Sequence, residues 1–127
     1  MKVVVQRAGT SGVTVNEKCV GKIDSGLVLL VAFKETDTID TINYMVKKIV
    51  NLRIFPDEAG IMNKSILDYG GSILSISQFT LYGDATKGNR PSYIMAAKGE
   101  VSKPLYDKFN ELLGEYVVVE TGIFGAD

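Results

Sequence analysis

The chain has 127 residues, a length typical of a single domain that buries its own core. Hydrophobic residues make up 46% of it and charged residues 23%, which excludes an intrinsically disordered protein. Its 14 basic and 15 acidic residues give a net charge of -1. The protein therefore has no general positive field, and any contact with nucleic acid must be local.

Absent and rare residue types exclude several kinds of site. The chain has no histidine, which excludes Ser-His-Asp and Cys-His catalysis and the usual His-ligated metal centres. Cys19 is the single cysteine, so neither a disulfide nor a Cys-based cluster is expected. The N-terminus has no signal-peptide order, and the longest apolar run, Leu27 to Phe33, is too short to span a bilayer. We expect a cytoplasmic protein without metal, cofactor or membrane contact.

The first quarter of the chain predicts strands. Lys2 to Arg7 is rich in β-branched residues, which favour a strand. The alternation from Val13 to Val15 and the return from Cys19 to Ile23 predict a hairpin. Leu27 to Phe33 lacks polar alternation, which indicates a strand buried on both faces.

Two amphipathic helices are expected. The first follows Asp37 or Thr38, because either side chain can accept hydrogen bonds from free backbone amides. Its apolar stripe has helical spacing and consists of Ile42, Met45, Val46, Ile49 and Val50. The second begins near Ser102 and has Pro104 in its first turn. Its expected buried face consists of Val101, Leu105, Phe109, Leu112 and Leu113.

Three further strands complete the expected fold, at Arg53 to Phe55, Ile73 to Leu81 and Val117 to Val119. Strands joined by tight turns, with two separated helices, favour an α+β (mixed α/β) fold. We therefore expect a single compact domain with a mostly antiparallel or mixed sheet and its helices on one side.

Polar residues interrupt the long strand at Ser77, Gln78 and Thr80. Strand periodicity places Ser77 and Phe79 on one face and Gln78 and Thr80 on the other. Polar side chains inside a sheet need hydrogen-bond partners. The segment therefore marks either a catalytic site or a strand end where hydroxyls meet water and backbone, and the pattern slightly favours the strand end.

The segment Gly83 to Ser92 combines glycines with Lys87 and Arg90. Backbone amides and positive charge together suit phosphate, and a plain solvated loop is the alternative. Ser92 is placed to cap a short helix that ends at Ala97, and its N-terminus would also favour an anion. By pattern alone, Arg7 is an ordinary surface charge. A small phosphate-bearing ligand suits this arrangement, but the pattern identifies no reaction.

The most specific segments are Ser77 to Leu81, which reads Ser-Gln-Phe-Thr-Leu, and Thr121 to Asp127, which reads Thr-Gly-Ile-Phe-Gly-Ala-Asp. With them, in collinear order, stand Met1 to Arg7, Lys48 to Phe55, Met62 to Ser65 and Lys87 to Ser92. These segments are spread from one end of the chain to the other, and they resemble the D-aminoacyl-tRNA deacylase (D-tyrosyl-tRNA deacylase) family.

The resemblance implies a homodimer that hydrolyses the ester between a D-amino acid and the 3′ end of tRNA, a proofreading step in translation. It extends to glycine mischarged on tRNA(Ala). The implied chemistry is substrate-assisted, with the terminal 2′-hydroxyl helping to activate water. The implied catalytic residues are Ser77, Gln78, Phe79 and Thr80, and the expected substrate-binding residues are Arg7, which the resemblance implies, and Lys87 and Arg90 of the loop.

Two features of this chain bear on what the resemblance implies. Thr80 carries a hydroxyl, but the sequence offers no base to activate it as a nucleophile. The family's second motif, Asn-x-Gly-Pro-x-Thr, rejects L-amino acids in the partner's site, and this chain contains no Gly-Pro dipeptide. We expect residues 1–127 to form one deacylase-like domain without that segment. The alternative is a truncated or non-catalytic domain that binds the acceptor end of tRNA without efficient deacylation.

Overall fold

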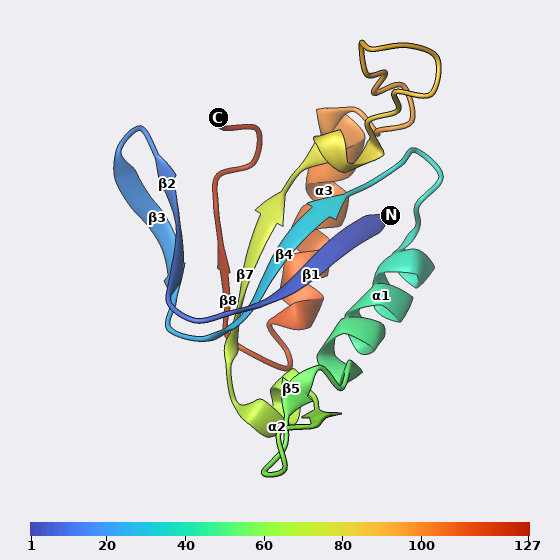
Figure 1. Cartoon of the computed structure of the whole chain (residues 1–127). Helices are drawn as coiled ribbons and strands as arrows, with labels where there is room; N and C mark the ends of the chain where they lie inside the picture. The colour runs from blue at the N-terminus through green and yellow to red at the C-terminus, as the bar shows by residue number, and fades with distance from the viewer.

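A computed structural model describes residues 1–127 and shows a mixed four-stranded sheet (Figure 1). The strands, in spatial order, are β1 (Lys2–Ala8), β4 (Gly26–Ala32), β7 (Ser72–Ser77) and β8 (Val119–Thr121). The edge strand β1 runs antiparallel to β4, while β4, β7 and β8 are parallel. The expected α+β class with a mixed sheet is confirmed.

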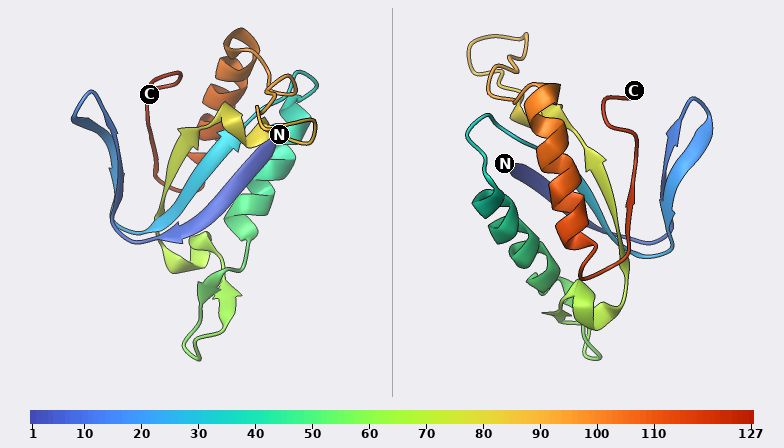
Figure 2. Two further views of the ribbon diagram at one scale, coloured as in Figure 1. Left: turned by 45° about the horizontal axis from the view of Figure 1, so that its top comes forward. Right: turned by 180° about the vertical axis from the view of Figure 1, so that it is seen from behind.

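Two long helices, α1 (Ile39–Asn51) and α3 (Gly99–Leu113), cover one face of the sheet (Figure 2). Thr38 caps α1, as one of the two expected candidates, because its side chain accepts from the Thr41 amide. The expected stripe of α1 is confirmed, with Met45 only half-buried. In α3, Phe109 and Leu113 are fully buried as expected, and Tyr106 is a buried residue that the stripe did not include.

The expected hairpin is formed by β2 (Ser11–Val15) and β3 (Lys18–Ile23) and stands beside β8, away from α1 (Figure 1). Gly21 of β3 approaches β8 so closely that any Cβ would clash with the Thr121 carbonyl. Three short elements that the sequence did not predict, or placed differently, lie at the opposite end from the chain termini. They are β5 (Phe55–Pro56), β6 (Met62–Lys64) and α2 (Ile66–Tyr69).

The long strand expected over Ile73 to Leu81 is wrong beyond Ser77. The Gln78 amide makes a last sheet bond to the Val31 carbonyl (2.8 Å). The chain then turns into a 3-10 helix, η1 (Phe79–Tyr82), in which the Leu81 amide bonds to the Gln78 carbonyl (3.2 Å). The alternating faces expected for Ser77 to Thr80 therefore do not exist, and the polar residues mark the end of the strand.

Other boundaries also differ from expectation. Helix α3 begins at Gly99, so Pro104 lies in its second turn rather than its first. Residues 92–97 form no helix, because a bridge to Asp84 holds Ser92 in extended backbone. The last strand begins at Val119, since the Val117 amide is still bonded to the Leu113 carbonyl (3.1 Å).

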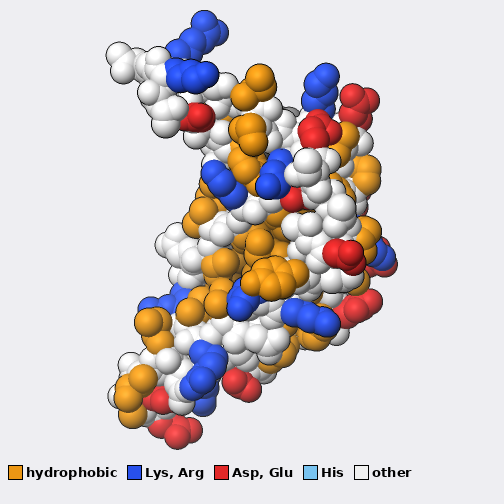
Figure 3. Space-filling view, turned by 90° about the vertical axis from the view of Figure 1, so that its right-hand side faces the viewer, with side chains coloured by type: hydrophobic (Ala, Val, Ile, Leu, Met, Phe, Trp, Pro, Cys, Tyr) orange, Lys and Arg blue, Asp and Glu red, His pale blue; other side chains and the backbone are white.

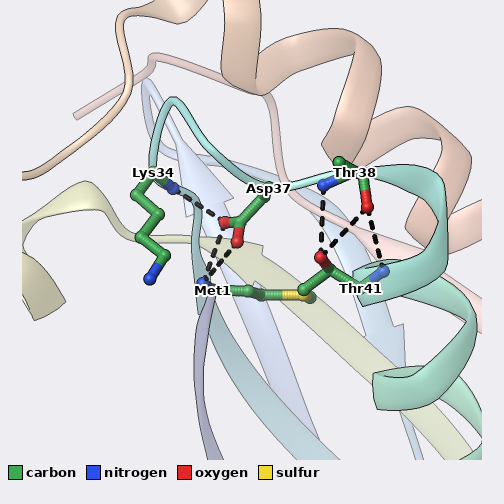
Figure 4. A network of polar contacts seen from close by, with 5 residues as sticks. All are labelled: Met1, Lys34, Asp37, Thr38 and Thr41. Carbon is green, nitrogen blue, oxygen red and sulfur yellow. Dashed lines mark hydrogen bonds and ion pairs between the residues drawn. The ribbon is translucent and has the colours of Figure 1, made fainter.

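A buried ion pair joins β1 to the loop before α1 (Figure 4). The Met1 ammonium lies 2.8 Å from a carboxylate oxygen of Asp37, whose side chain is 2% exposed. The Lys34 amide donates to the same carboxylate (2.8 Å). The carboxylate therefore fixes the start of the edge strand against the chain that leaves β4.

We expect Asp37→Asn to lower the free energy of unfolding by about 3 kcal/mol, because it leaves a buried ammonium without its counter-charge. Urea titration followed by circular dichroism measures the change. Asp40→Asn, in the exposed first turn of α1, is the control and should change stability by less than about 1 kcal/mol. Equal stabilities for the two variants would contradict this role of Asp37.

Candidate functional site

A cavity of about 430 Å³ lies where β4 and β7 end. Because these strands are parallel, their carboxyl ends meet at one edge of the sheet, the usual place for a ligand in such sheets. The start of α3 and the C-terminal tail close the cavity. Its lining residues are Val31, Ala32, Phe33, Ser77, Gln78, Phe79, Ala97, Gly99, Ser102 and residues 124–127.

The polar side of the cavity consists of the residues at the end of β7. Ser77, Gln78 and Phe79 line it. Thr80 does not; it is exposed, and its hydroxyl accepts a hydrogen bond from the Gln78 side-chain amide. Phe79 is 56% exposed and packs edge-on against Tyr93, with ring centroids 5.4 Å apart. The structure thus brings three of the four expected catalytic residues into one cavity and keeps the fourth in contact with them.

The N-terminus of α3 supplies a second polar wall through Gly99 and Ser102. The first amides of a helix have no acceptor within it, and the helix dipole gives that end partial positive charge. Lys98, the residue before the helix, provides no side-chain cap, so no side chain of its own competes for these amides. No helix begins at Ser92, so the anion-favouring helix end expected there is wrong, and the helix end that borders the cavity is that of α3 at Gly99.

Lys87 and Arg90 lie on an exposed loop beyond η1 and do not line the cavity. Asp84 closes the base of the loop, where its carboxylate accepts from the Thr86 amide (2.9 Å) and its backbone bridges to Ser92. The Thr86 amide holds the pKa of the Asp84 carboxyl below its usual value. Neither Lys87 nor Arg90 has a carboxylate within 4.0 Å. Figure 3 shows Lys and Arg side chains projecting at the top, where Figure 1 places this loop.

Arg7 lies at the far end of β1 from the cavity. It pairs with Leu27 at the start of β4, whereas Lys2 pairs with Ala32, which lines the cavity. The Lys2 ammonium reaches η1, where it donates to the Leu81 carbonyl (3.4 Å) and lies 4.7 Å from the centre of the Tyr82 ring. Within one chain, Lys2 rather than Arg7 is the cation close to the site, and the sequence patterns did not single it out.

The tail wall was another feature that periodicity missed. Residues 124–127 line the cavity although they belong to no helix or strand. The Phe124 ring is held 5.8 Å from that of Tyr106, on α3. The signal that could have found this wall was the specific segment Thr121 to Asp127 rather than any pattern of hydrophobicity.

No helix of the structure combines the length and the apolar character needed to cross a membrane. No three side chains among its Cys, Asp and Glu residues lie together as a metal-binding group. Cys19, on β3, is exposed and unpaired.

Comparison with known proteins identifies the family. Residues 4–127 match the family model described as D-Tyr-tRNA(Tyr) deacylase. A D-aminoacyl-tRNA deacylase from Listeria monocytogenes serotype 4a is 53% identical over 127 residues, 99% of this chain and 84% of that protein.

Two solved structures share the fold. The c-Myc DNA Unwinding Element Binding Protein is 37% identical with a TM-score of 0.94, over 100% of this chain and 87% of that one. A probable eukaryotic D-amino acid tRNA deacylase, 19% identical with a TM-score of 0.81, covers 98% of this chain and 89% of its own. By its sequence and its fold, the chain belongs to the D-Tyr-tRNA(Tyr) deacylase family, hydrolases that cleave the ester bond of aminoacyl-tRNA.

Proposed function

We propose that the cavity where β4 and β7 end is the place where this D-aminoacyl-tRNA deacylase binds the acceptor end of tRNA and hydrolyses its ester. The observation that carries the proposal is the convergence of Ser77, Gln78 and the first turn of α3 on one cavity. Its volume of about 430 Å³ lies within the range of small-ligand sites and suits an aminoacyl group with part of its ribose.

The first turn of α3 suits the charge that develops during hydrolysis. Attack of water on the ester carbonyl gives a tetrahedral intermediate with a negatively charged oxygen. Backbone amides aimed at such an oxygen are among the strongest sources of catalysis in acyl transfer. The Gly99 amide, which has no acceptor within the helix, is the donor of this kind at the cavity.

Positioning of substrate and water replaces an imidazole base in this account. Thr80 has no base beside it, since its hydroxyl accepts a hydrogen bond from the side-chain amide of Gln78. The substrate itself carries a 2′-hydroxyl next to the ester. That hydroxyl orients the attacking water; the bond from the carbonyl carbon to the 3′-oxygen breaks, and the 3′-oxygen takes the proton. The products are a free D-amino acid and tRNA, with no covalent enzyme intermediate. The non-catalytic alternative is not favoured, because the relatives that match nearly the whole chain are deacylases.

A second substrate and a cellular location are also proposed. A cavity that admits a D side chain also admits glycine, which has none, so glycyl-tRNA(Ala) is a second proposed substrate. Because aminoacyl-tRNA is made and used in the cytoplasm, we place the protein there.

A homodimer is supported by the outer face of the sheet, opposite the helices. Register places Val4, Leu30 and Ile76 side by side on that face, and Val4 is 46% exposed on the edge strand β1. An apolar sheet face next to an unpaired edge favours association with a second copy. A two-fold axis beside β1 would bring Arg7 of one subunit toward the cavity end of its partner, which gives Arg7 a place in substrate binding.

Thr80→Ala should keep hydrolysis of D-tyrosyl-tRNA within about threefold of the unchanged protein, because no covalent step runs through this hydroxyl. Gln78→Ala, which removes a side chain that lines the cavity, should slow it by at least about tenfold. Single-turnover release of D-tyrosine measures both. A trapped acyl-enzyme at Thr80, or a loss of nearly all rate in Thr80→Ala, would sink the proposed mechanism.

Lys87 and Arg90 are proposed as phosphate contacts for the unpaired end of tRNA. Replacing both with alanine should flatten the plot of log affinity against log salt by about 1.4 units, roughly 0.7 for each contact to a single strand. Lys103→Ala with Lys108→Ala is the matched control, because these lysines of α3 pair with Asp107 and Glu111. If the loop variant and the control show the same slope, the loop does not contact phosphate.

Val4→Glu should convert the proposed dimer into a monomer, because it places a charge in the apolar face. Sedimentation equilibrium at micromolar concentration reports the mass. Ile61→Glu changes another exposed apolar residue, one outside that face, and should leave the dimer intact. A monomeric unchanged protein would refute the dimer outright.

A further inference from the structure

The β7–β8 ladder stops before β7 reaches the cavity. Its last pair is Ser75 with Thr121, two residues short of Ser77. At its start, the Ile73 amide bonds to the Val118 carbonyl (2.9 Å), so the backbone groups of every second residue, including Ser75 and Ser77, face β8. Beyond Thr121 the tail makes no further ladder pairs with β7. The Ser75 carbonyl and the Ser77 amide are the groups that the next pair of ladder hydrogen bonds, here called the missing rung, would have used.

Tyr106 fills this gap from α3. Its side chain is buried, with the residue 3% exposed, and its hydroxyl donates to the Ser75 carbonyl (2.7 Å). Burial raises the pKa of Tyr106, while hydrogen bonding with Ser75, Asn110 and the Ser77 backbone lowers it. The Tyr106 hydroxyl therefore satisfies the Ser75 carbonyl, one of the two backbone groups that β8 leaves free, and its oxygen lies near the other, in the Ser77 backbone. The Tyr106 ring also lies beside Phe124 of the tail wall.

We propose that Tyr106 is a positioning residue for the deacylation reaction, whose hydroxyl takes the place of the missing rung and fixes Ser77 at the cavity. This inference rests on the proposed function of that cavity. On its β4 side, the end of β7 is held by the Gln78 amide bond to Val31. On its β8 side, the Tyr106 hydroxyl is the group that holds it. Without that hydroxyl, Ser77 and the chain reversal after it gain freedom at the place where the ester must be held.

The test is Tyr106→Phe, which removes one oxygen and keeps the ring. Hydrogen exchange followed by NMR, without substrate, should show faster exchange at the Ser77 amide. The Gln78 amide, bonded to Val31, is the internal control and should change little. In deacylation of D-tyrosyl-tRNA, kcat should fall about tenfold with KM nearly unchanged, because a displacement of about 1 Å costs about a hundredfold and this one is smaller. Asn110→Ala should show the same pattern with smaller amplitude.

Tyr116→Phe, at an exposed tyrosine, controls for loss of a phenol elsewhere on the surface. An unchanged rate of hydrogen exchange at the Ser77 amide in Tyr106→Phe would overturn the proposal that the Tyr106 hydroxyl holds this strand end. Faster exchange with unchanged kcat would overturn the positioning role and leave only a structural one. If the unchanged protein released no D-tyrosine, the proposed function would fail, and the exchange measurement would still decide whether Tyr106 holds Ser77. Should Tyr106→Phe fail to fold, Asn110→Ala decides by the same two measurements.

Discussion

The parallel pairing of β4 with β7 is the constraint on which the rest of the molecule depends. The register runs from Gly26 with Ser72 to Val31 with Ser77, and the Gln78 amide closes it. Because the strands are parallel, both release the chain at the same edge of the sheet. The segment that follows β4 leads to α1, and the segment that follows β7 enters η1. The space between these two segments becomes the cavity. Helix α3 and the tail then close a site whose position β4 and β7 have already set.

The chemistry follows from the same constraint. A protein without histidine has no side chain of ordinary pKa that exchanges protons near neutral pH. It can still accelerate ester hydrolysis by holding the ester, water and substrate hydroxyl together and by directing backbone amides at the developing charge. Such catalysis requires a rigid strand end, and here the Gln78 amide bonds to the Val31 carbonyl while the Tyr106 hydroxyl bonds to the Ser75 carbonyl. In the proposed mechanism, rigid backbone replaces a catalytic base.

Much of the fold could be predicted from sequence, because periodicity reports burial. The continuous apolar run of β4 and the stripe of α1 with its Thr38 cap are examples. The ends of elements were harder. Helix α3 begins after Lys98, whose side chain does not cap it, so no start signal could be recognised at that position. The end of β7 depends on a bond from Gln78 to Val31, a tertiary contact that no local pattern reports.

The candidate site was predictable in part, because a polar residue in an otherwise apolar strand is visible in the sequence pattern. Polar residues in an apolar strand marked Ser77 and Gln78. The two other walls could not be found that way, because Gly99 and the tail reach the cavity only through the packing of α3 and residues 124–127. Arg7 was assigned by resemblance, and it lies at the far end of β1 from the cavity, so its role in the proposed function depends on the proposed second subunit.

In the proposed mechanism the substrate, rather than a side chain of the protein, assists the attacking water. Single-turnover hydrolysis of tRNA carrying D-tyrosine on the 3′-oxygen, with a terminal adenosine or a terminal 2′-deoxyadenosine, tests it directly. The 2′-deoxy substrate should bind with similar affinity and be hydrolysed more slowly by about a hundredfold, the lower range for an acid–base contribution. Equal rates for the two substrates would contradict it.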